Sequence, residues 1–140
     1  MKQRIFVDTA AWLALVNKSD EAHQKAKEIR DNLLRLQAQL VLTDYVVLEV
    51  ANALCKIPFR SAAVKLINSI RTTKIIQVVE IDKGIYKEAW MLYSGRPDKE
   101  WSLTDCASFV VMRQTGITEA FTTGGNRVRS QQSTRLREST

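Results

Sequence analysis

The sequence predicts an α/β fold in which helices cover both sides of a central parallel sheet, a three-layer α/β/α sandwich. Short β-branched or aromatic runs alternate along the chain with longer segments of helical periodicity. That alternation is typical of parallel strands joined by crossover helices. The length of 140 residues and the hydrophobic content of 45% are enough for one buried core and too little for two domains.

The first expected element is a buried strand at residues 5–7, because three large apolar residues are followed at once by a change of pattern. Residues 9–16 are apolar on nearly all faces, which predicts a buried helix. A second helix is expected to run to about residue 37, capped by Ser19 or Asp20.

Residues 40–42 are the second strand candidate, a short run of aliphatic side chains. Thr43 or Asp44 can cap a third helix that continues to about residue 55, since apolar residues recur there at helical spacing. Pro58 suits the first turn of a fourth helix, where its missing N–H leaves no hydrogen bond unmade.

A β-branched run at residues 75–79 predicts the third strand, and residues 83–93 predict a helix. Another helix is expected at residues 103–114, closed by Gly116, because glycine readily adopts the left-handed conformation that ends helices. Residues 120–123 form the last expected strand.

Three carboxylates stand where the sequence otherwise indicates core. Asp8 ends the first strand, Glu49 lies within an apolar helix, and Asp105 opens a long apolar run. Two of them have a structural alternative: Asp8 fits a helix cap, and Asp105 follows Ser102 by three residues, as in a capping box. Glu49 has no lysine or arginine within four residues on either side, so a local ion pair does not explain it.

The carboxyl ends of parallel strands and the helix starts that follow them meet at the edge of the sheet where ligands bind. We therefore expect Asp8, Glu49 and Asp105 to converge on one pocket there. Hard divalent cations such as Mg²⁺ and Mn²⁺ prefer oxygen ligands, and they activate water for attack on phosphates. The residues thus predict a metal-dependent phosphodiesterase, with helix capping as the alternative explanation.

Composition restricts the partners and the compartment. The formal net charge is +6, and residues 56–74 hold five basic and no acidic residues, which suits either RNA or a solvated helix face. Cys55 and Cys106 are expected as buried thiols, and no signal segment or membrane span is evident, so we expect a cytoplasmic protein.

Residues 124–140 carry four arginines and one glutamate. We expect them to form a disordered basic tail that follows a domain of residues 1–123.

Three segments together resemble the PIN-domain ribonucleases, above all the VapC-like toxins of toxin–antitoxin modules: Ile5-Phe6-Val7-Asp8-Thr9, Thr43 to Glu49, and Trp101-Ser102-Leu103-Thr104-Asp105-Cys106-Ala107. The resemblance covers about residues 4 to 123. It implies a PIN-like sandwich that cleaves RNA with Mg²⁺ or Mn²⁺. It also implies RNA and an antitoxin-like protein as partners, and a homodimer.

The resemblance also implies roles for individual residues. Asp8, Glu49 and Asp105 become the catalytic metal ligands. The neighbouring hydroxyl groups become contacts to those ligands or to phosphate, namely Thr9, Ser102 and Thr104.

One departure from the family pattern concerns the end of the last strand. The family usually has a further Asp there and a closing strand, whereas Phe121-Thr122-Thr123 runs into Gly124-Gly125 and an arginine-rich segment. Asp98 is a conceivable substitute, although a loop Asp before a lysine is typical of an exposed turn. The missing carboxylate predicts impaired activity. It also leaves open an inactive PIN-like module that binds RNA or an antitoxin-like protein.

Overall fold

The computed structural model describes residues 3–124 and 127–129, and its strands form one sheet in the order β3-β2-β1-β4-β5. The strands β1 to β4 pair in parallel, and β5 pairs antiparallel with β4. The strand bounds are β1 Arg4–Val7, β2 Gln39–Thr43, β3 Ile76–Val79, β4 Ala120–Gly124 and β5 Arg127–Arg129.

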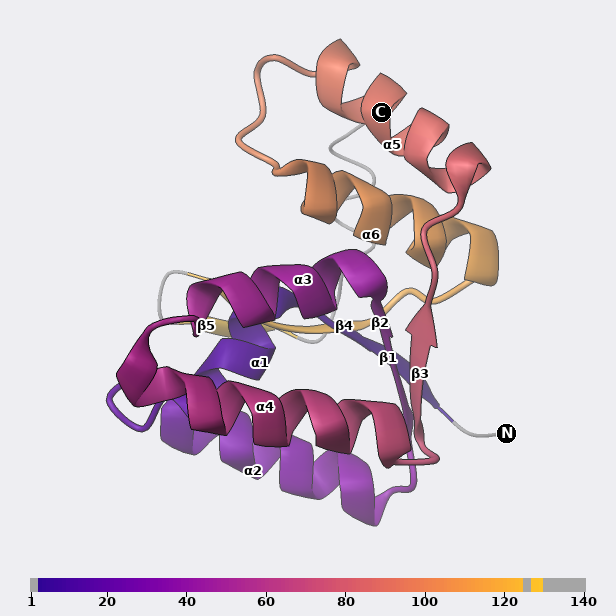
Figure 1. Cartoon of the computed structure of the whole chain (residues 1–140). Helices are drawn as coiled ribbons and strands as arrows, with labels where there is room; N and C mark the ends of the chain where they lie inside the picture. The colour runs from indigo at the N-terminus through magenta and orange to yellow at the C-terminus, as the bar shows by residue number, and fades with distance from the viewer. Residues whose placement is uncertain (1–2, 125–126, 130–140) are drawn as a thin grey trace.

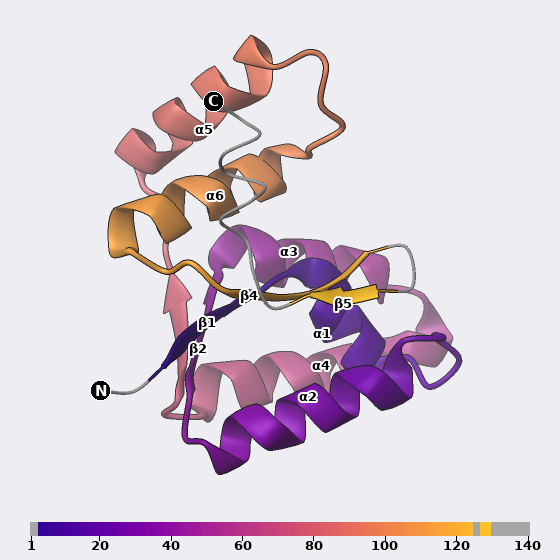
Figure 2. The same ribbon diagram turned by 180° about the vertical axis from the view of Figure 1, so that it is seen from behind.

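Six helices surround this sheet within the described residues (Figure 1). Their bounds are α1 Thr9–Val16, α2 His23–Arg35, α3 Asp44–Ala53, α4 Ile57–Thr72, α5 Lys83–Gly95 and α6 Leu103–Thr115. Figures 1 and 2 show α2 and α4 on one side of the sheet, α3 and α6 on the other, and α5 packed outside α6. The predicted three-layer sandwich is confirmed.

The strand β1 lies at the centre of the sheet, because it pairs with β2 on one side and β4 on the other. Its apolar residues Ile5, Phe6 and Val7 are at most 2% exposed. A fully buried strand of this kind is a continuous apolar run, as the sequence showed. Asp8 follows directly, and its backbone N–H donates to the Phe121 carbonyl at 3.2 Å. The position after β1 is therefore anchored to β4.

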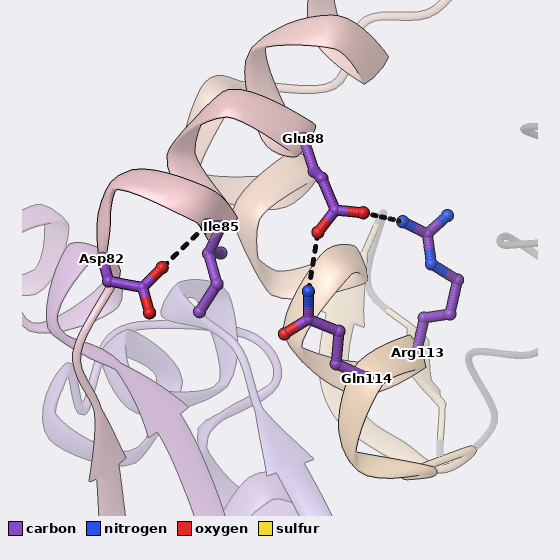
Figure 3. A network of polar contacts seen from close by, with 5 residues as sticks. All are labelled: Asp82, Ile85, Glu88, Arg113 and Gln114. Atoms are coloured by element: carbon purple, nitrogen blue, oxygen red, sulfur yellow. Dashed lines mark hydrogen bonds and ion pairs between the residues drawn. The ribbon is translucent and has the colours of Figure 1, made fainter.

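Side-chain caps set four helix starts, and each satisfies a backbone N–H that has no partner inside its helix. Asp82 begins α5 by accepting from the Ile85 N–H at 2.8 Å (Figure 3). The other three caps are Asp8 for α1, Thr43 for α3 and Ser102 for α6. At the other end of α6, Gly116 has φ 75°, the left-handed conformation expected there.

The helices α5 and α6 form an antiparallel pair held at one end by polar contacts (Figure 3). The Glu88 carboxylate accepts from Gln114 Nε2 at 2.6 Å and from Arg113 Nη2 at 3.3 Å. These groups are exposed, so the ion pair adds little stability by itself. They link α5 to α6 away from the loop of residues 96–102, which joins the other ends of the two helices.

Two local predictions about the chain were wrong. The helix α2 begins at His23 rather than after Ser19 or Asp20, because Asp20 instead closes a turn by accepting from the Ala22 N–H at 2.8 Å. Cys106 is buried as expected, but Cys55 is exposed, since it follows α3 in a segment that leaves the core.

The sheet continues beyond the expected domain end at residue 123. The strand β4 includes Gly124, and β5 pairs with it through Thr123↔Val128 and Gly124↔Arg127. The closing strand that the sequence seemed to lack is therefore present. The rest of the expected basic tail, residues 125–126 and 130–140, lies outside the described residues. Among the described helices, none is long and apolar enough to cross a membrane.

Candidate active site

The three predicted carboxylates come from three elements at the carboxyl end of β1. Asp8 lies between β1 and α1, Glu49 lies in the middle of α3, and Asp105 lies in the first turn of α6. The helix α3 contacts both α1 and α6 (Figure 1). Strand and helix order alone thus bring the three chain positions to one region, as expected from parallel α/β topology.

Asp8 is both a helix cap and a cavity residue. Its Oδ1 accepts from the Ala11 N–H at 3.0 Å, which begins α1. Its side chain also lines a small cavity beneath α6. Capping α1 therefore does not prevent Asp8 from lining the cavity.

Asp105 likewise takes part in helix capping and lines this cavity. It forms a reciprocal capping box with Ser102: Asp105 Oδ2 accepts from the Ser102 N–H at 3.0 Å, and Ser102 Oγ accepts from the Asp105 N–H at 2.9 Å. This box fixes the carboxylate at the helix N-terminus, where negative charge is stabilised. Asp105 lines the same cavity as Asp8.

This carboxylate cavity has a volume of about 10 Å³, close to the roughly 10 to 15 Å³ that one water molecule requires. Its lining residues are Phe6, Asp8, Asp105, Ser108, Phe109, Met112 and Ala120. Four of these lie on α6 at spacings of three and four residues, which place them on one helical face. That spacing is visible in the sequence, and it could have added Ser108 to the predicted site.

Glu49 is held differently, outside the lining of this cavity. The Thr9 hydroxyl donates to Glu49 Oε1 at 2.6 Å, which explains how a half-buried carboxylate without a nearby cation is accommodated. Thr9 is the neighbour of Asp8, so the hydrogen bond brings Glu49 to the cavity region. In the part of the chain that the structure describes, no group of three or more His, Cys, Asp or Glu side chains is arranged to hold a metal ion.

The remaining predicted residues have identifiable positions. Ser102 caps α6, and the backbone carbonyl of Thr104 accepts from Ser108 Oγ at 3.0 Å. Asp98 lies in the α5–α6 loop, exposed and paired with Arg96 at 3.0 Å. This hydrogen bond lowers the pKa of Asp98 to about 2. Asp98 is therefore an arginine partner in an exposed turn and does not replace the missing carboxylate.

The pKa of Cys106 depends on burial and on the nearby negative charge in the first turn of α6. Burial, with a further contribution from the neighbouring Asp105 charge, raises the pKa of Cys106 to about 11. The thiol thus stays protonated at neutral pH and is a poor nucleophile.

A second cavity near the site was not predicted from the sequence. It has a volume of about 490 Å³ and lies at the α5–α6 loop, with Tyr93, Arg96, Lys99 and Trp101 among its lining residues. We call it the loop cavity. The sequence signal was available, because two aromatic and two basic residues occur within nine positions.

Comparison with known proteins gives consistent matches over most of the chain. A family model described as "PIN domain" matches residues 5–130. The "23S rRNA-specific endonuclease VapC20" of Mycobacterium tuberculosis, found for two strains, is 30% identical over 122 residues, which are 87% of this chain and 90% of that protein. The crystal structure of M. tuberculosis VapC20, described as a sarcin–ricin loop cleaving toxin, superposes with a TM-score of 0.77 at 28% identity, covering 87% of this chain and 91% of that one.

Proposed function

Because the chain belongs to the PIN-domain family, we propose that it is a toxin-type endoribonuclease that hydrolyses RNA phosphodiester bonds with Mg²⁺ or Mn²⁺. The observation that carries the proposal is the placement of Asp8 and Asp105 on one cavity, at the carboxyl end of the central strand. Glu49 lies beside them through its hydrogen bond from Thr9.

The donor set fits a small, hard cation. Two carboxylates line a cavity with room for about one water-sized species, and oxygen is the ligand that Mg²⁺ and Mn²⁺ prefer. In the proposal Asp8 and Asp105 hold the ion, and Glu49, which the Thr9 hydroxyl orients from beside the cavity, is the third ligand. A bound divalent ion supplies charge stabilisation at the scissile phosphate and a water of lowered pKa.

The chain's own residues keep the carboxylates in place for this work. The Ala11 N–H positions Asp8, and the Ser102 N–H positions Asp105, each through one carboxylate oxygen. Thr9 does the same for Glu49 from a neighbouring helix. Partners of this kind orient metal ligands, and losing them typically weakens metal binding by roughly 10- to 100-fold.

The relatives suggest which RNA to test first. VapC20 is named for 23S rRNA and described as cleaving the sarcin–ricin loop, so the proposed substrate class is structured ribosomal RNA, which this protein would meet in the cytoplasm. An antitoxin protein and a second copy of the chain are the proposed protein partners.

The direct test is cleavage of an RNA hairpin with the sarcin–ricin sequence, with Mg²⁺, with Mn²⁺ and with a chelator. We expect cleavage that needs the metal and falls at least roughly 100-fold in Asp8→Asn and in Asp105→Asn. Both substitutions keep a side-chain oxygen for the cap, so the fold should persist. Equal cleavage by wild type and both variants would contradict the proposal.

A second function is favoured by two observations. No carboxylate follows Thr123 at the end of β4, and the described residues contain no closed three-ligand group. Both fit a PIN module that binds RNA or an antitoxin-like protein without cleaving. Tight hairpin binding without cleavage in any divalent metal would select this second function.

A further inference from the structure

The loop cavity adjoins the carboxylate cavity across one helical turn. Asp105 lines the carboxylate cavity, whereas its neighbour Cys106 lines the loop cavity. Trp101 precedes the cap of this turn and packs edge-on against Phe109, with ring centroids 5.1 Å apart at 79°. Trp101 and Asp105 are therefore both positioned by α6, Trp101 through its contact with Phe109 and Asp105 by its place in the first turn.

Two cations lie near the Trp101 ring. Arg96 Cζ is 5.8 Å and Lys99 Nζ is 5.5 Å from the ring centroid, within the range of cation–π attraction. Asp98 fixes Arg96 through Nε and Nη2, both at 3.0 Å. Lys99 differs, because within residues 3–124 its ammonium group forms no salt bridge, and its charge makes only a minor contribution to the lowered pKa of Asp98. Lys99 is therefore the cation that can turn toward a ligand.

The walls of the loop cavity are held by the α5–α6 pair. Tyr93, at the end of α5, stacks on Trp90 with centroids 5.6 Å apart. At the opposite end of the pair, Glu88 ties α5 to α6 (Figure 3). Tyr93 thus lies on α5, and Trp101, at the end of the loop, packs against Phe109 of α6. These supports limit the entropy lost when a ligand is bound.

The class of ligand is inferred from the aromatic surface of the loop cavity rather than from its net charge. Glu100 also lines the loop cavity and Asp98 neutralises Arg96, so the local charge is balanced. A tryptophan before a helix cap often serves only to pack against the helix. Trp101 packs against Phe109 in a T-shaped pair, yet it remains partly exposed in a cavity of about 490 Å³, within the roughly 300 to 1,000 Å³ of ligand sites. A ligand with a flat π face and one anionic group matches this surface.

We infer that the loop cavity is a nucleotide subsite in which the base of one unpaired nucleotide stacks on Trp101 and its phosphate contacts Lys99. The inference rests on the proposed RNA-cleaving function, and it names the substrate feature read beside the scissile bond. Base stacking on aromatic side chains tolerates every base, so the subsite selects an unstacked nucleotide rather than a sequence.

The test measures binding of the sarcin–ricin hairpin in a chelator, where no cleavage occurs, with a series of hairpins that each lack one base. In the wild-type protein, one abasic position in the loop should weaken binding by about 5- to 150-fold, the range of one stacked base. In Trp101→Ala the same abasic position should change affinity less than about twofold, because the stacking partner is gone.

Two further variants guard against a structural effect. Phe59→Ala removes an exposed aromatic side chain on α4 that does not line the loop cavity, and it should retain the full abasic penalty. Trp101→Phe keeps an aromatic face, and it should retain part of the penalty even where Trp101→Ala fails to fold. Lys99→Ala should weaken binding to intact and abasic hairpins alike and reduce its salt dependence.

The outcomes separate this inference from the proposed function. The compared quantity is the loss of affinity caused by each abasic position. If this loss is the same in the wild type and in Trp101→Ala, or in Trp101→Phe, at every position, the inference is overturned, even if the hairpin is cleaved. A penalty that disappears with Trp101 supports the inference, even if no metal produces cleavage and the nuclease proposal fails.

Discussion

The helix starts at Asp8 and Asp105 and the middle of α3 hold their carboxylates in two different ways. At the helix starts, each carboxylate accepts from a backbone N–H within its own turn. In α3, Glu49 accepts from the Thr9 side chain, which comes from another helix 40 residues away in the chain. At each helix start, the helix cap and the proposed metal ligand are therefore the same residue, whereas in α3 the proposed ligand Glu49 is held by a different residue, Thr9.

This difference teaches how mutants should be designed. Replacing a capping carboxylate by alanine removes the cap and the proposed ligand together, so lost activity is ambiguous. Replacing it by asparagine removes only the charge. At Glu49 the structural hydrogen bond and the charge can also be removed separately. Thr9, the hydrogen-bond donor, can be changed while the Glu49 carboxylate is kept.

The largest expected effect concerns Glu49→Gln, which tests whether α3 belongs to the same site as the helix starts. Glutamine can still accept from Thr9, so the fold should be unaffected. If Glu49 completes the metal site, hairpin cleavage should fall by roughly 100-fold or more, as for Asp8→Asn. Unchanged cleavage would limit the site to the two carboxylates on the cavity.

The next effect is on metal affinity, through Thr9. Thr9→Val removes the hydroxyl and should weaken Mn²⁺ binding by roughly 10- to 100-fold, because Glu49 loses its orienting partner. Thr9→Ser keeps the hydroxyl and is the matched control. The measurement is the Mn²⁺ concentration that raises the melting temperature, since an ion that binds only the folded state stabilises it. Equal Mn²⁺ dependence in both variants would show that Thr9 serves packing alone.

A smaller effect, on the free energy of unfolding, should separate helix capping by Asp8 from its proposed metal binding. Asp8→Ala should be less stable than Asp8→Asn by about 1 kcal/mol, because alanine cannot accept from the Ala11 N–H. Denaturant unfolding without metal measures the difference. Equal stabilities would mean that the cap contributes nothing and that Asp8 is present for the site alone.

The smallest expected effect is a gain. Residues alternate between the two faces of a strand, so an aspartate at position 124 should point to the same face as Ala120, which lines the carboxylate cavity. Gly124→Asp should therefore tighten Mn²⁺ binding several-fold, on the order of the Coulomb attraction of one added anion in a partly exposed site. Gly124→Asn is the uncharged control. No difference between the two would place position 124 away from the metal.

Local signals in the sequence predicted most of the fold, and two of the three candidate carboxylates, Asp8 and Asp105, line one cavity. Asp8, Ser102 and Gly116 determine helix ends through contacts within one turn, and such contacts depend on few neighbours. The strand β5 was missed because its pairing with β4 is not encoded in its own composition. The bond between Thr9 and Glu49 was equally hidden, since it joins two helices that only the folded sheet brings together.

The two edges of the sheet have a consequence for how the protein behaves when it is concentrated. One edge is β3, with four residues, and the other is β5, with three. Unpaired edge groups invite strand pairing between molecules, and short edge strands limit it. By covering β4, β5 replaces a longer parallel edge with a shorter antiparallel one. This part of the chain therefore protects the folded domain against edge-to-edge aggregation.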